Sequence, residues 1–159
     1  MKVTMKKDST NHKLKPGKKN YLIVSNDGYT RGLMTFAYFK KRLSELGFSN
    51  RVHVQTAGLV VSKGLTPDPL AVKILKKKEI PLNGFQVEPV SEDLLKKADV
   101  VIALSRENHN YLRNTYHATP PKVRILNVPV LIAKKEENYE NAFQKIEESL
   151  DQELQSLKA

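Results

Sequence analysis

Residues 25–32 bring together the groups of this chain best suited to chemistry, with the sequence Ser-Asn-Asp-Gly-Tyr-Thr-Arg-Gly. They lie between an apolar run at 21–24 and a helical pattern that starts at Thr30. Backbone N–H groups at a helix N-terminus point into one cup, where the helix dipole adds roughly half a positive charge. Arg31 could clamp two oxygens of a phosphate-like anion, and Gly28 suits a left-handed position in the loop. The segment therefore indicates an oxyanion site.

The same segment also permits a plain turn between a strand and a helix. Asp27 places a carboxylate in the cup, where it would repel phosphate. In this alternative, Asp27 or Thr30 caps the helix and Arg31 is solvated. The loop alone leaves both interpretations open.

The absence of cysteine limits the chemistry of the whole chain. It excludes disulfides, thiolate metal sites and any mechanism that uses a cysteine nucleophile. The histidines are scattered, so we expect neither a metal site nor a cofactor. They are His12, His53, His109 and His117.

The elements that must position the loop alternate between strands and helices. Short runs rich in Val, Ile and Leu predict strands at 21–24, 52–54, 100–104 and 123–126. Apolar residues at steps of three and four predict helices at 30–46, from 66 onward, at 91–98, from 105 to about 112, and a long one ending near 157. Thr66-Pro67-Asp68, Ser91 and Ser105 mark helix starts.

Strands separated by helices pair in parallel through right-handed crossovers. We therefore predict a three-layer α/β/α domain over residues 20–159, with a four-stranded parallel sheet. Such sheets bind ligands beyond the carboxyl ends of their strands, which is where residues 25–31 would lie.

Several short motifs follow one another along the chain: 21–25 with Arg31, Val54-Gln55-Thr56-Ala57-Gly58, 67–71, Glu79-Ile80-Pro81, 91–94, 98–102 and Tyr139-Glu140. Their order resembles that of the low-molecular-weight protein tyrosine phosphatases. That family has an apolar strand followed by Cys-x5-Arg-Ser and a helix, and the likeness covers about residues 20–157. The resemblance implies the strand order 2-1-3-4. Related arsenate reductases need several cysteines, so that branch is excluded.

Several positions depart from the family pattern. Ser25 stands at the position of the nucleophilic cysteine, and Gly32 stands at the position of the following serine. Val130 occupies the place of the aspartate that acts as general acid, within 128–131. Asp27 replaces a glycine, and Gly28 replaces an asparagine. A serine hydroxyl ionises far less than a thiol, and losing a general acid costs roughly 10²–10⁴-fold in rate.

The resemblance and these departures leave three hypotheses for the loop Ser25, Asn26, Asp27, Gly28, Tyr29, Thr30 and Arg31. We favour a natural pseudophosphatase that binds phosphate, sulfate or a phosphorylated protein through this loop. The second is an active phosphatase that uses Ser25, or an enzyme with one engineered Cys-to-Ser change at that position. The third is a protein-interaction module with a closed pocket, in which Asp27 pairs with Arg31.

The charge is concentrated at the start of the chain. Residues 1–19 hold seven lysines and one aspartate, so they carry +6 of the formal charge of +10. We expect a disordered, solubilising tail, with nucleic acid or anionic lipid as the alternative, weaker partner. No apolar run approaches the roughly 20 residues of a membrane span, and a cytoplasmic location is expected. The sequence does not indicate an oligomeric state.

Overall fold

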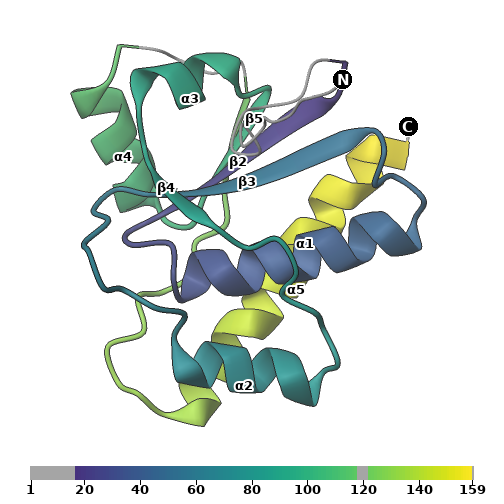
Figure 1. The fold of residues 1–159 in the computed structure, drawn as a ribbon, viewed down its shortest axis with the longest axis vertical. Coiled ribbons are helices and arrows are strands. Elements are labelled where there is room, and N and C mark those ends of the chain that lie inside the picture. Colours follow the sequence, from purple (N-terminus) through teal and green to yellow (C-terminus); the bar gives the residue numbers. More distant parts are fainter. Residues whose placement is uncertain (1–16, 118–121, 159) are drawn as a thin grey trace, which may run out of the picture.

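The computed structural model describes residues 17–117 and 122–158, so the predicted tail over 1–19 lies almost entirely outside the described residues. Ten elements alternate along this part of the chain (Figure 1). They are β2 (Lys19–Ser25), α1 (Arg31–Glu45), β3 (Val52–Gly58), α2 (Pro69–Lys77), β4 (Val87–Pro89), α3 (Glu92–Lys97), β5 (Val100–Ala103), α4 (Arg106–Thr115), β6 (Lys122–Ile125) and α5 (Glu136–Lys158). Among the described residues, no helix is both long and apolar enough to cross a membrane.

The strands form one parallel sheet with the order β4-β3-β2-β5-β6. The predicted α/β class is confirmed, and the four predicted strands have the predicted order. The predicted count of four is wrong by one, because β4 adds a fifth strand at the edge. β4 has three residues and pairs only with Thr56–Gly58. A strand this short has too few residues to show a two-residue pattern, so only its pairing defines it.

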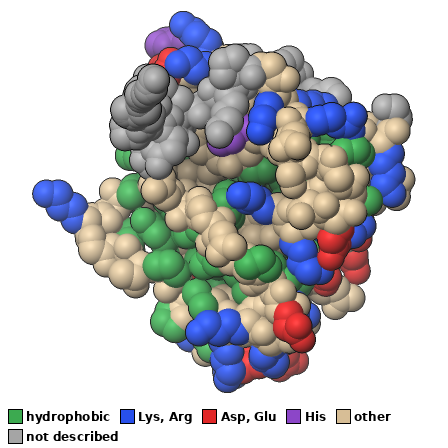
Figure 2. Space-filling view, turned by 45° about the vertical axis from the view of Figure 1, so that its right-hand side comes forward, with side chains coloured by type: hydrophobic (Ala, Val, Ile, Leu, Met, Phe, Trp, Pro, Cys, Tyr) green, Lys and Arg blue, Asp and Glu red, His purple; other side chains and the backbone are tan. Residues whose placement is uncertain are grey.

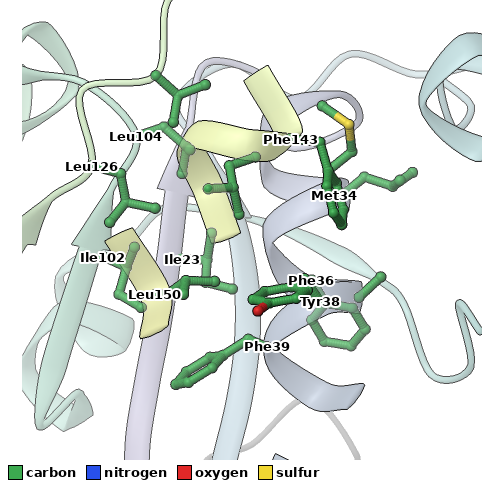
Figure 3. Packing of buried hydrophobic residues seen from close by; sticks show 14 of the residues in the cluster. Ile23, Met34, Phe36, Tyr38, Phe39, Ile102, Leu104, Leu126, Phe143 and Leu150 are labelled. Carbon is green, nitrogen blue, oxygen red and sulfur yellow. The ribbon is translucent and has the colours of Figure 1, made fainter. Parts of the chain in front are cut away.

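Helices cover both faces of the sheet, and the alternation of side chains along β2 shows how. Tyr21 and Ile23 pack with α1, α2 and α5, in the larger of two buried clusters. Leu22 and Val24 pack on the opposite face, with residues of α3 and α4. Figure 3 shows side chains of α1, α5, β2 and β5 meeting in the larger cluster. The three predicted layers are therefore present.

Helix caps explain where three of the helices begin. The Ser91 hydroxyl accepts a hydrogen bond from the Leu94 N–H, and Ser105 accepts one from the Asn108 N–H, both at 3.1 Å. These two predicted starts are confirmed. The start predicted at Thr66 is early, because Asp68 is the cap and Pro69 is the first helical residue of α2.

The carboxylate of Asp68 also joins elements that are far apart in the sequence. One oxygen accepts the Leu70 N–H at 3.0 Å. The other accepts the Tyr139 hydroxyl at 2.6 Å, the Thr30 hydroxyl at 3.0 Å and the Lys134 ammonium at 3.2 Å. Burial by itself would raise the pKa of Asp68, but these hydrogen bonds outweigh it, and the pKa lies below its usual value. The start of α1, the start of α2, α5 and the loop before α5 thus converge on one buried charge.

Replacing this charge should destabilise the fold in a pH-dependent way. Asp68→Asn keeps the shape but loses charge-assisted bonds, so we expect the free energy of unfolding near neutral pH to fall by about 2–3 kcal/mol. Because folding lowers the pKa of Asp68, its contribution is complete above the unfolded pKa of about 4 and is lost as pH falls through the folded value. Urea unfolding at several pH values should therefore show the two proteins converging in acid. Asp93→Asn, at an exposed ion pair with Lys97, is the control and should change stability by less than about 1 kcal/mol. An equal loss in both variants would contradict the role given to Asp68.

Candidate oxyanion site

The loop between β2 and α1 is held from outside by backbone hydrogen bonds. Ser25 O accepts the Leu59 N–H at 3.0 Å, and Asn26 O accepts the Val60 N–H at 2.9 Å. Further along, Tyr29 O accepts the N–H of Asp68 at 3.0 Å. The segment after β3 therefore fixes the loop at both ends.

Ser25 is the last residue of β2 and is buried at the start of this loop. It is 3% exposed, and its Oγ has no hydrogen-bond partner among the described residues. A Cβ placed on Gly32 would lie 2.7 Å from this Oγ. Gly32 thus leaves the space around the hydroxyl open, where the resemblance implied a serine.

Arg31 is buried in the first turn of α1 and is only partly paired. Its Nη1 donates to Val128 O at 2.7 Å, whereas its Nη2 has no partner. Burial lowers the pKa of Arg31, and the nearby carboxylates of Asp27 and Glu107 oppose that shift. The segment after β6 therefore orients Arg31, and the predicted clamp on an anion stays a prediction.

Asp27 does not pair with Arg31. Its carboxylate accepts the Tyr29 N–H at 2.8 Å, and the ion pairs among the described residues include none between Asp27 and Arg31. The pairing expected for a closed pocket is thus absent from this part of the chain. The carboxylate instead binds a loop amide, as an aspartate in a tight turn commonly does.

The remaining loop residues are placed by their neighbours. Gly28 has φ +87°, which confirms the predicted left-handed position, and a Cβ there would lie 2.7 Å from Val87 Cγ1. The ring of Tyr29 packs edge-on against Phe85, with 6.0 Å between centroids. Thr30 occupies the cap position of α1 without a side-chain capping bond, because its hydroxyl donates to Asp68.

A cavity of about 140 Å³ opens above the loop. Its walls come from the loop itself and from the segment after β6, which the resemblance had marked at Val130. Lys134 also lines it, and nothing in the sequence distinguished that residue from an ordinary solvated lysine. The lining residues are Ser25, Asn26, Asp27, Thr30, Arg31, Val130, Leu131 and Lys134.

A wider depression of about 580 Å³ adjoins this cavity and shares Asn26 and Val130 with it. Beside it, the Asn108 side chain donates to Asn26 Oδ1 at 2.7 Å, although its own Oδ1 is buried without a partner. Nothing in the sequence distinguishes Asn108 from the other polar residues of α4. The bond shows that it positions Asn26.

The site therefore holds an uncapped helix N-terminus, a buried guanidinium and a buried hydroxyl at the carboxyl ends of parallel strands. Parallel α/β sheets bind ligands at this edge, and helix N-termini attract anions. No group of His, Cys, Asp and Glu residues that could hold a metal ion occurs among the described residues.

Comparison with known proteins gives the family. The sequence profile of low molecular weight phosphotyrosine protein phosphatase matches residues 20–159, so the chain belongs to this family. The protein-arginine-phosphatase of Bacillus subtilis (strain 168) is 28% identical over 102 residues, which cover 64% of this chain and 66% of that protein. The match thus spans slightly less than two thirds of the relative's own length.

Solved structures agree with this assignment. A mutant of YwlE from Bacillus subtilis superposes with a TM-score of 0.80 at 25% identity, covering 89% of this chain and all of the other. A YwlE arginine phosphatase in which serine replaces the cysteine, and whose active-site serine is phosphorylated, gives a TM-score of 0.78 at 26% identity. That match covers 87% of this chain and 95% of the other.

The charge of Asp27 should weaken anion binding by the loop. Asp27→Asn keeps an oxygen to accept the Tyr29 N–H but removes the like charge, so affinity for sulfate or phosphate should rise about fivefold, or ~1 kcal/mol. Titration followed by calorimetry at low ionic strength measures the change. Asp93→Asn, which lies on α3, should leave affinity unchanged. Equal affinities in wild type and Asp27→Asn would show that the carboxylate does not act on the anion.

Proposed function

We propose that this chain binds a phosphoryl group, on a phosphorylated protein or as a free oxyanion, through residues 25–31, and does not turn it over by the chemistry of its family. The observation that carries the proposal is a pair of buried polar atoms without partners, Ser25 Oγ and Arg31 Nη2. Leaving such a group unsatisfied costs roughly 1–3 kcal/mol. Oxygens of a bound anion would satisfy both atoms.

The charges around the cavity favour an anion on balance. Arg31 lines it, and the N-terminus of α1 adds partial positive charge. Lys134 also lines it, but its charge is shared with the Asp68 carboxylate. Asp27 is the one carboxylate in the lining, and its bond to the Tyr29 amide reduces its effect. This balance of charges supports a modest affinity for anions.

The cavity lacks the proton-transfer groups that hydrolysis of a phosphate ester usually requires. The lining residues include no histidine that could take a proton from Ser25, and Val130 has no proton to give a leaving group. Asp27 already accepts a backbone N–H. These features support a pseudophosphatase over a multiple-turnover hydrolase.

Calorimetric titration tests the binding step. Phosphate, sulfate and phosphotyrosine should bind with dissociation constants on the order of 0.1–1 mM. Arg31→Lys should weaken binding by about tenfold or more, because an ammonium cannot replace the guanidinium's fork of N–H groups. Arg113→Lys, on the exposed side of α4, is the matched control. If no ligand produces heat at millimolar concentration, the oxyanion site is excluded and a pure protein-interaction module remains.

A second candidate is single phosphoryl transfer to Ser25, and the relative with a phosphorylated active-site serine favours it. In this step, a bond forms between Ser25 Oγ and phosphorus while the bond from phosphorus to the donor's leaving group breaks. The hydroxyl proton passes to the leaving group or to water. Without a group to activate water, the phosphoserine would accumulate.

Mass spectrometry separates the two candidates. Incubation with p-nitrophenyl phosphate should leave the intact mass unchanged if the chain only binds, and should add about 80 Da if Ser25 accepts the phosphoryl group. Ser25→Ala should abolish any such gain. Continuous release of nitrophenol by wild type, lost in Ser25→Ala, would contradict the absence of turnover. Equal background rates in the two proteins would exclude a hydrolase that uses Ser25.

A further inference from the structure

The outer edge of β3 is only partly covered. β4 pairs with Thr56–Gly58, beside the carboxyl end of β3, and leaves Val52–Gln55 outside its register (Figure 1). The other edge of β3 pairs with β2 along its full length. Half of β3 is therefore an edge strand within the described sheet.

The backbone groups on this edge can be assigned from the alternation of the strand. Gly58 O accepts the Val90 N–H at 3.0 Å, which shows that Gly58 faces outward. Because backbone groups alternate between the two edges of a strand, Thr56, Val54 and Val52 face the same way. The Val52 N–H donates to Phe48 O, but no described strand pairs with Val54. Its N–H and C=O are directed at the uncovered edge.

A groove of about 330 Å³ follows this edge and extends to both faces of the sheet. On one face it is lined by Phe36 and Lys40 of α1, and on the other by Gln55 and by Glu88 of β4. Gln86, just before β4, completes the far wall. Because this groove surrounds the edge of the strand instead of lying over one face of the sheet, it occupies the place where an added strand would run, about 4.8 Å from β3.

Gln55 provides an independent indication of a ligand. It is 7% exposed, and neither its amide oxygen nor its amide nitrogen has a hydrogen-bond partner in the part of the chain that the structure describes. A primary amide is satisfied by a group that offers a donor and an acceptor together, as a peptide bond does. Leaving a buried amide without hydrogen bonds costs free energy. A peptide in the groove that bonded to Gln55 would recover this free energy and would therefore bind more tightly.

The charge of the lining indicates which peptide. Lys18 and Lys40 outnumber Glu88 among the Lys, Arg, Asp and Glu side chains of the groove. Lys40 also lies over the Phe36 ring, 5.4 Å from its centroid, which holds its ammonium beside the groove. Figure 2 shows Lys and Arg spread over the face drawn there, with Asp and Glu mostly toward its right and lower edges. An acidic segment is therefore favoured over a basic one.

We propose that an extended acidic segment of a partner protein binds here by adding a strand to the edge of β3 at Val54. The uncovered segment of four residues spans about 13 Å, so about four residues of the partner would pair. Backbone bonds to Val54 supply affinity, Gln55 bonds a peptide group of the partner, and Lys18 and Lys40 select acidic side chains. The site is separate from residues 25–31 and does not depend on the proposed phosphoryl binding.

The first test uses capped pentapeptides in which Glu alternates with Val and Thr, titrated into the full chain and followed by fluorescence anisotropy. We expect dissociation constants on the order of 100 µM, and at least about tenfold weaker binding when Lys replaces Glu in the peptide.

Two further peptides carry an N-methyl group at one or the other of two adjacent central residues. Because only alternate residues face β3, one methyl group should abolish binding and the other should not. Equal effects of the two, or no acidic peptide bound at 1 mM, would overturn the proposal.

Variants of the chain give the second test. Val54→Pro removes the outward N–H at an edge position, where proline is tolerated, and should weaken binding at least about tenfold. Gln55→Leu should weaken binding about fivefold while leaving thermal stability equal or higher, because it removes an unsatisfied buried amide. A Gln55→Leu protein that is less stable and binds normally would contradict the role of this amide. If Val54→Pro fails to fold, the N-methyl comparison still decides.

Peptide binding and the Val54→Pro variant also test two other occupants of the edge of β3. Binding that appears only in a chain starting at residue 17 would assign the groove to residues 1–16 and overturn the partner segment. A dimer in analytical ultracentrifugation that Val54→Pro dissociates would assign it to a second copy, with the same consequence.

Discussion

The arrangement of the site depends on the buried carboxylate of Asp68. Four donors converge on it, from α2, α5, the cap position of α1 and the loop before α5, and two of them, Thr30 and Lys134, line the cavity above residues 25–31. A buried charge is tolerated only when hydrogen bonds replace its lost hydration. The carboxylate therefore fixes the relative positions of its donors, and with them the walls of the cavity. Tyr139 connects the same point to α5, which packs across the core.

The chain has the fold of its family, but Ser25 and Val130 stand where the family pattern implies a cysteine and an aspartate. In the proposed function, the loop, α1 and Arg31 would hold the phosphoryl oxygens. The nucleophile position carries a hydroxyl without a base in the cavity lining, and the acid position carries Val130, 54% exposed. Holding an anion needs donors and positive charge, whereas breaking a phosphorus bond needs proton transfer in addition. These requirements are separable, which is why we propose binding without turnover.

Much of the fold follows from local patterns in the sequence. Four strands, their order and the caps at Ser91 and Ser105 could be predicted, because apolar runs and capping residues act over a few neighbours. The ordered motifs also placed Val130 beside the loop. β4, the convergence on Asp68 and the position of Lys134 could not be predicted, since each depends on contacts between residues tens of positions apart. Asp27 illustrates the difference: the sequence allows its carboxylate to face the cup, to cap the helix or to pair with Arg31, and only the structure shows that it accepts the Tyr29 N–H two residues on.

The close approach of Gly28 to Val87 has an evolutionary consequence. A Cβ at position 28 would overlap the Val87 side chain, which is stiff because it branches at Cβ, and the φ of +87° adds strain for most residues. The asparagine that the family carries at this position would therefore require a smaller residue at 87, on a different strand. A serine at Gly32 would likewise crowd Ser25. A side chain at either position would thus need a second, compensating change in a neighbouring residue, so the two glycines and their neighbours can change only together.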